Sequence, residues 1–134
     1  MNISKIETYL HSIIDNVVSD NTYVGTLPDT IQTKWNDMCL IDVGNSIYDL
    51  DAYGRGVVHI LLYARPLMNG AKNVAVMSKL EQKLDDVIAN ATSDKYCINR
   101  RSTYTDYDSE RKWHCNIVVL NITIVLIKQK GKRI

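Results

Sequence analysis

Two segments with helical hydrophobic spacing are each followed by two strand-like segments, and this order limits the fold more than any other feature of the chain. In both helical segments, apolar residues recur at intervals of three and four, which places them along one side of a helix. The strand-like segments contain β-branched, apolar and aromatic residues and are bounded by Gly, Pro, Asn or Asp. The order is helix 3–19, strands 38–43 and 55–65, helix 74–91, and strands 96–104 and 112–127.

This order predicts an α+β fold of the type helix-strand-strand-helix-strand-strand. Each helix has a single apolar side and therefore covers one surface, so we expect a mainly antiparallel four-stranded sheet with two helices packed on one face. Asn73 is a plausible N-cap for the second helix. The charged segment 105–111 is expected to form a hairpin tip between the last two strands.

The 134 residues suffice for one domain with one core, so 1–134 is interpreted as a single α+β domain. Residues 22–36 contain Pro28 and have no regular pattern, and we interpret them as an ordered connection. Residues 128–134 are expected to be a mobile basic tail.

The last strand-like segment, 112–127, is apolar on both of its faces in the middle. One face is expected to meet the helices. The other face then needs a second cover, which a neighbouring subunit could supply.

Charge and cysteine content limit the classes of partner. Sixteen Lys and Arg residues oppose fifteen Asp and Glu residues, and a net charge of +1 provides no general attraction for nucleic acid. We therefore expect no sequence-specific nucleic-acid partner. Three cysteines at long spacings resemble neither a disulfide framework nor a zinc site, which favours a reducing compartment. No apolar run reaches the roughly 20 residues that cross a bilayer, and the first ten residues do not resemble a signal peptide, so a soluble protein without a membrane partner is expected.

No catalytic, cofactor-binding or metal-binding residue is predicted. Asp106, Asp108 and Glu110 are interpreted as a solvated turn, because that segment lacks the glycine and the further ligands of a calcium loop. Glu81 begins a Glu-Gln-Lys triplet of the kind found on strands of metal-dependent nucleases, but here it lies within a helix. A small metal-dependent nucleic-acid-processing enzyme that uses Glu81 with Asp49 and Asp51 remains an alternative.

Tyrosine and arginine side chains near the last two strands are the candidates for partner binding. Both residue types are enriched at protein interfaces, where aromatic rings and guanidinium groups are buried on association. We expect the segment Tyr104–Arg111 to contact a neighbouring molecule. The predicted partner-binding residues are Tyr104, Asp106, Tyr107 and Arg111, with Arg55, Arg65 and Arg101 as contacts for acidic groups.

The order of elements from Ile3 to Ile127 resembles the tail terminator, or tail completion, proteins of long-tailed bacteriophages. The likeness lies in the helix 3–19, the strand that ends at Arg65-Pro66, the helix 74–91 and the long hairpin, and it includes no diagnostic motif. The connection 22–36 departs from the pattern of that family.

The resemblance implies a virion structural protein without catalytic residues or cofactors. Such a protein is made in the host cytoplasm and forms a ring, usually a hexamer, at the head-proximal end of the tail. The ring ends the tail tube and joins it to the head, so its partners would be further copies of itself, the tail-tube protein and the head or neck connector proteins. Another phage neck or head-completion protein, or a monomeric adaptor within a host complex, is an alternative that oligomeric state and neighbouring genes would distinguish.

Overall fold

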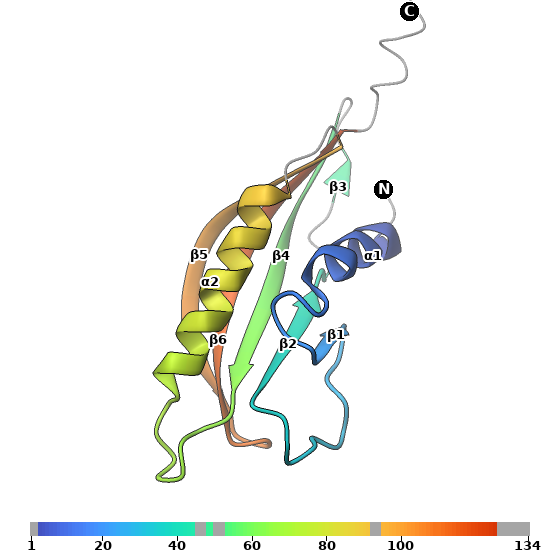
Figure 1. Ribbon diagram of the computed structural model, residues 1–134. Helices are drawn as coiled ribbons and strands as arrows, with labels where there is room; N and C mark the ends of the chain where they lie inside the picture. Colours follow the sequence, from blue (N-terminus) through green and yellow to red (C-terminus); the bar gives the residue numbers. More distant parts are fainter. Residues whose placement is uncertain (1–2, 45–47, 50–52, 92–94, 126–134) are drawn as a thin grey trace, which may run out of the picture.

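The computed structural model describes residues 3–44, 48–49, 53–91 and 95–125, which form two helices and one mixed β-sheet (Figure 1). The expected tail 128–134 and the end of the last predicted strand lie outside the described residues. The elements are α1 (Ile3–Ile14), β1 (Thr22–Val24), β2 (Asp37–Asp42), β3 (Tyr48–Asp49), β4 (Tyr53–Ala64), α2 (Val74–Asn90), β5 (Tyr96–Asp108) and β6 (Trp113–Val125).

The sheet has the order β1-β2-β4-β6-β5, and the two-residue strand β3 pairs with β4 beside this path. β1 runs parallel to β2, whereas the remaining pairs are antiparallel. The chain is thus α+β, but the prediction of a mainly antiparallel four-stranded sheet is wrong. The sheet is mixed, with five strands in its main order.

The additional strand β1 comes from the segment that was expected to be an irregular connection. α1 ends earlier than expected, at Ile14, and Asn16 then adopts a left-handed conformation with φ of 62°. After Asn16 the chain turns back toward β2, and two hydrogen bonds hold it there. The Asn21 side-chain amide donates to the Asp37 carbonyl at 3.0 Å, and the Cys39 N–H donates to the Asn21 carbonyl at 3.0 Å. These long-range contacts, rather than a local hydrophobic pattern, place β1 beside β2.

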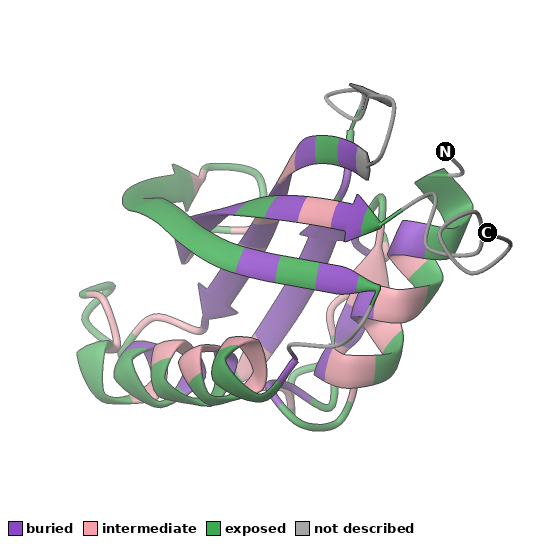
Figure 2. Ribbon diagram, turned by 90° about the horizontal axis from the view of Figure 1, so that it is seen from above, coloured by how far each residue is buried: buried purple, intermediate pink, exposed green. Residues whose placement is uncertain are grey.

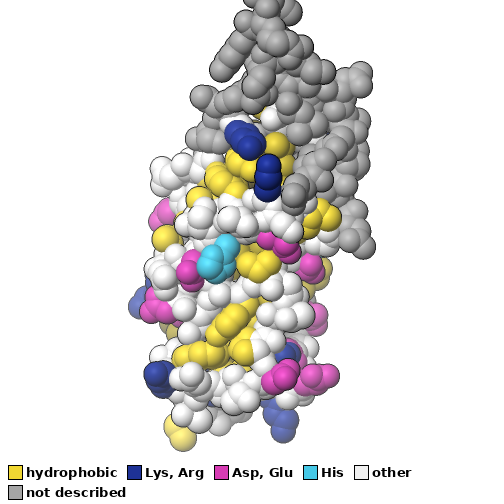
Figure 3. Space-filling view, turned by 90° about the vertical axis from the view of Figure 1, so that its right-hand side faces the viewer, with side chains coloured by type: hydrophobic (Ala, Val, Ile, Leu, Met, Phe, Trp, Pro, Cys, Tyr) yellow, Lys and Arg dark blue, Asp and Glu magenta, His cyan; other side chains and the backbone are white. Residues whose placement is uncertain are grey.

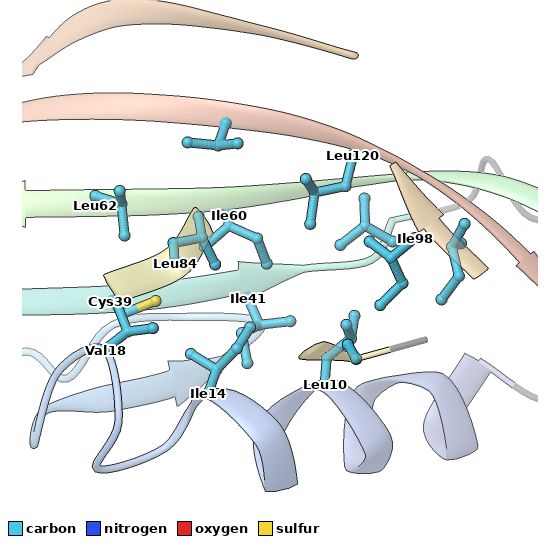
Figure 4. Packing of buried hydrophobic residues seen from close by; sticks show 14 of the residues in the cluster. Leu10, Ile14, Val18, Cys39, Ile41, Ile60, Leu62, Leu84, Ile98 and Leu120 are labelled. Carbon is cyan, nitrogen blue, oxygen red and sulfur yellow. The ribbon is translucent and has the colours of Figure 1, made fainter. Parts of the chain in front are cut away.

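Both helices lie on the same face of the sheet, as the view from above shows (Figure 2). α2 begins where the sequence predicts it, because the Asn73 side chain accepts a hydrogen bond from the Val76 N–H at 3.2 Å and caps the helix. Apolar side chains of the two helices meet those of the strands in the main core (Figure 4). Its fully buried members include Ile6, Leu10 and Ile14 of α1, Met77, Leu80 and Leu84 of α2, and Ile41, Ile60, Leu62, Leu120 and Ile122 of the sheet.

A second core lies on the opposite face of the sheet, where the chain provides its own cover. Buried side chains of β2, β4 and β6 pack there against the connection between β1 and β2. A neighbouring subunit is therefore not needed over this part of the face, which corrects the expectation drawn from the last strand. The second core consists of Leu27, Met38, Leu40, Tyr63, Trp113, Cys115 and Ile117, with Tyr23, Ile31, Trp35 and Leu61 packed around it.

The hairpin of β5 and β6 is longer in its strands and shorter in its turn than the sequence predicts. β5 continues to Asp108, which pairs with Trp113, so the predicted tip 105–111 is largely strand. The turn closes with a 2.6 Å hydrogen bond from the Lys112 N–H to the Asp108 carbonyl, and Lys112 has a φ of 61°. The hairpin is irregular at one point, a β-bulge between Arg100 and Ser102.

Candidate protein-interaction surface

The outermost strand β5 is the most exposed element of the sheet. It pairs with β6 on one side, and no described strand pairs with its other side. The side chains from Asn99 to Tyr107 are all exposed. A long strand with a free edge offers its outward N–H and C=O groups to a strand of another molecule.

The hydrogen-bond alternation identifies which backbone groups of β5 point outward. The Val125 N–H donates to the Lys95 carbonyl at 2.9 Å, so the odd-numbered residues of β6 bond to β5. In an antiparallel pair, the residues between these bonded positions direct their N–H and C=O groups away from the partner. Between the bulge and the hairpin turn, those residues are Thr103, Thr105 and Tyr107, because they pair with even-numbered residues of β6.

The bulge region of β5 is tied to α2 by Arg100. Its guanidinium lies 2.6 Å from the Asp85 carboxylate and 3.6 Å from Glu81, and its Nε donates to the Thr103 hydroxyl at 2.9 Å. Since α2 packs on the sheet through its apolar side, these contacts hold the middle of β5 in place. The free edge is therefore supported by the fold.

Three of the predicted contact residues are exposed on β5 between the bulge and the hairpin turn: Tyr104, Asp106 and Tyr107. Tyr104 pairs with Ile117 on the face away from the helices, and Tyr107 packs against His114 on the helix face with ring centroids 5.0 Å apart. Tyr104 is 51% exposed and Tyr107 is 47% exposed. Each face of this part of β5 thus carries an exposed tyrosine beside the free edge. Tyrosine is enriched at protein interfaces.

Two other predicted contact residues are engaged within the chain. Arg65 donates from Nε to the Trp35 carbonyl at 2.7 Å and from Nη2 to the Gln32 carbonyl at 3.0 Å. Arg111 pairs with Asp108 at 3.0 Å. Both side chains hold the chain at the turn end of the molecule, and a role of either in partner binding stays a prediction.

Asp108 is the acceptor at the centre of the hairpin turn. Burial alone would raise the pKa of Asp108, but the N–H groups of Arg111 and Glu110, together with the Arg111 guanidinium, lower it below its usual value. These donors lie 3.0 to 3.1 Å from the carboxylate oxygens. The carboxylate that the sequence assigns to a solvated turn is thus a structural element of the turn.

The remaining two predicted arginines, Arg55 and Arg101, line one hollow. It lies on the sheet face away from the helices, across β4, β6 and β5, and has a volume of about 370 Å³. The sequence does not reveal that these two arginines line the same hollow, because they belong to β4 and β5, which β6 separates in the sheet. Its other polar lining residues are Asn99, Asn121 and Thr123. Asn121, a polar residue within the apolar sequence of β6, is the sequence signal that would have indicated this hollow.

The acidic residues of the alternative enzyme hypothesis are not seen to form a site. Glu81 forms the ion pair with Arg100, Asp49 belongs to β3, and Asp51 lies outside the described residues. Within the described parts of the chain, no group of three His, Cys, Asp or Glu residues could hold a metal ion. Neither described helix is long and apolar enough to cross a membrane.

The opposite edge of the sheet is different in character. α1 and β1 lie on this side, and Figure 3 shows hydrophobic side chains gathered there in a band bordered by charged groups. β1 is only three residues long. The molecule therefore presents two unlike edges.

Comparison with known proteins adds no relative from which a function could be transferred. No protein-family model matches the chain, and no curated protein matches it.

Proposed function

We propose that the protein is a structural component of a bacteriophage virion that forms a ring at the head-proximal end of the tail, where it ends the tail tube and joins it to the head or neck. The observation that carries this proposal is the free edge of β5, with outward backbone groups at Thr103, Thr105 and Tyr107. Strand addition at such an edge is a common way to join protein subunits.

The two unlike edges of the sheet suit a ring. A closed ring of identical subunits uses two different surfaces on each subunit, which meet head to tail around the axis. Here β5 bounds one side of the sheet and β1, with α1 beside it, bounds the other. A contact between the β5 side of one subunit and the β1 side of the next would repeat until the ring closes. The likeness of the element order to tail terminator proteins favours six subunits.

Replacing Thr105 with proline tests the role of the β5 edge. Proline removes the outward N–H, and an edge strand tolerates proline at a position that does not bond to its own sheet. Thr105→Ala is the matched control, because it removes the same side chain and keeps the N–H. Both variants are measured by native mass spectrometry and analytical ultracentrifugation, alone and with the tail-tube protein encoded in the same genome.

We expect rings from the wild-type chain and from Thr105→Ala, and monomers from Thr105→Pro with an unchanged circular dichroism spectrum. Rings of Thr105→Pro that form at wild-type concentrations would show that β5 is not the joining edge. A wild-type chain that neither forms a ring nor binds the tube protein would overturn the proposed function itself.

A further inference from the structure

We propose that the hollow lined by Arg55 and Arg101 binds a carboxylate group from an acidic segment of a partner protein. This inference goes beyond ring formation and does not rest on it, because the hollow lies on the face of the sheet and not along the β5 edge.

The floor of the hollow is a row of register partners. Asn121 of β6 pairs with Asn99 of β5 on one side and with Val57 of β4 on the other. Arg55 stands two residues along β4 from Val57, opposite Thr123. Neighbouring strands lie about 4.8 Å apart, and Arg101 lies more than three residues further along the sheet than Arg55, so their backbones are roughly 15 Å apart. The two side chains therefore reach the hollow from different ends.

The alternation of side chains along β5 explains why Arg101 faces the hollow. Consecutive strand residues point to opposite faces, and Arg100 points toward α2, where Asp85 and Glu81 neutralise its charge. Arg101 therefore points to the other face and lines the hollow. With the part of the chain that the structure describes, Arg101 forms no hydrogen bond and no ion pair.

The chemistry of the lining selects an anion. Guanidinium groups, side-chain amides and a hydroxyl are hydrogen-bond donors, and no described residue of the lining carries a carboxylate. A guanidinium donates two parallel hydrogen bonds to one carboxylate or phosphate, which makes such a contact strong and directional.

A protein carboxylate fits this site better than a nucleic acid does. Nucleic-acid binding uses a series of cations that follow the phosphate backbone, and single strands also stack bases on aromatic rings. The described lining contains two arginines and no aromatic side chain. The net charge of +1 gives no wider positive field around the hollow. Arg101, with the side-chain amides of Asn99 and Asn121 in the same lining, offers donors that match one acidic side chain of a partner.

Titration of the full chain with a hexaglutamate peptide, followed by two-dimensional ¹H–¹⁵N NMR, tests the proposal. We expect the peptide to shift the side-chain amide signals of Asn99 and Asn121 and the Nε–H signal of Arg101. Arg101→Gln should weaken binding about tenfold, which corresponds to about 1.4 kcal/mol. Asn121→Asp, which places a negative charge in the hollow, should weaken it at least as much.

Lys83→Gln is the matched control, because it removes one exposed positive charge from α2, on the opposite side of the sheet, and leaves β5 in place. It should change the peptide affinity less than twofold. No shift of the Asn99 and Asn121 signals at millimolar peptide, or an unchanged affinity of a folded Arg101→Gln variant, would overturn the proposal. A single-stranded oligothymidylate that binds tenfold more tightly than the peptide at equal salt would also overturn it, in favour of nucleic acid. Because the side-chain signals of Asn99 and Asn121 report the hollow and not the β5 edge, these outcomes do not depend on whether a ring forms.

Discussion

The guanidinium of Arg65 lies 4.7 Å from the centre of the Trp113 ring, at the end of β4 where the connection between β1 and β2 passes over the sheet. The same guanidinium donates to the backbone carbonyls of Gln32 and Trp35. One side chain thus joins the connection to the second core. Arg65 is the main polar contact of a segment that otherwise packs through apolar side chains.

Replacing Arg65 with alanine should lower the free energy of unfolding by about 2–3 kcal/mol, because two hydrogen bonds to a charged group and a cation–π contact are lost. Arg65→Lys keeps the charge but not the planar guanidinium group, and should lower the free energy of unfolding by an intermediate amount. Urea unfolding measures both. Arg101→Ala serves as control and should stay within about 0.5 kcal/mol of wild type, since Arg101 is exposed. An Arg65→Ala variant as stable as this control would mean that the connection is held by apolar packing alone.

Asp108→Asn should destabilise the chain at neutral pH by an amount that shrinks in acid. The folded-state pKa of Asp108 is lowered by its donors despite burial, so the stabilisation is complete above the unfolded-state pKa of about 3.9 and is lost as the pH falls through the lower folded-state pKa. Urea unfolding of the variant and of wild type from pH 7 to pH 2 measures the difference. Glu110→Gln, at an exposed turn position, is the control. A difference that stays constant over this range would exclude the carboxylate charge as its cause.

The three cysteines should differ in reactivity. Burial raises the pKa of Cys39, with a further contribution from the charge of Asp37, and burial raises the pKa of Cys115 to about 12. Cys97 is exposed. Since the thiolate is the reactive form, iodoacetamide at pH 8 should modify one thiol in the folded chain and three in urea, as intact mass measures. Cys97→Ser should abolish rapid modification of the folded chain. Rapid modification of Cys39 in the folded state would indicate that the main core opens readily.

Truncation of the exposed tyrosines should impair assembly more than folding. Replacing Tyr107 and Arg111 with alanine removes contacts that the sequence predicts for a partner, but Arg111 also anchors Asp108. Tyr104→Ser is therefore the cleaner substitution, because its ring is half exposed beside the free edge. We expect normal thermal unfolding and at least about tenfold weaker subunit association, as anchors at interfaces commonly contribute about 2 kcal/mol. Unchanged association measured by ultracentrifugation would place the interface elsewhere.

Sequence periodicity predicted those elements whose hydrophobic side is long and uninterrupted. The helix expected at 74–91 and the strand expected at 55–65 correspond to α2 and β4, with ends that differ by one or two residues. A repeating hydrophobic pattern indicates which side of a helix or strand is buried, but it does not indicate which other element packs against that side. The position of β1 depends on Asn21 and on pairing with residues 17 positions later in the chain, which no local pattern reports.

The candidate surfaces were predictable in residue type and not in arrangement. Tyr104 and Tyr107 were predicted to contact a partner and lie exposed on β5. The meeting of Arg55 and Arg101 at one hollow depends on the strand order, which the sequence does not report. The charged composition of 105–111 favours a loop, yet pairing with the apolar strand β6 extends β5 through most of it. Tertiary pairing outweighs local propensity in this strand.

The bulge divides β5 into two segments with opposite parity. Before it, odd-numbered residues such as Asn99 face away from the helices, and after it the even-numbered residues Tyr104 and Asp106 do so. Each residue of the outer half takes the face of its register partner in β6, so deleting the bulged residue would restore simple alternation and leave those faces unchanged. The sheet thus absorbs one additional residue at a single point, and an insertion or deletion there would alter the hollow without altering the tyrosines that the outer half presents.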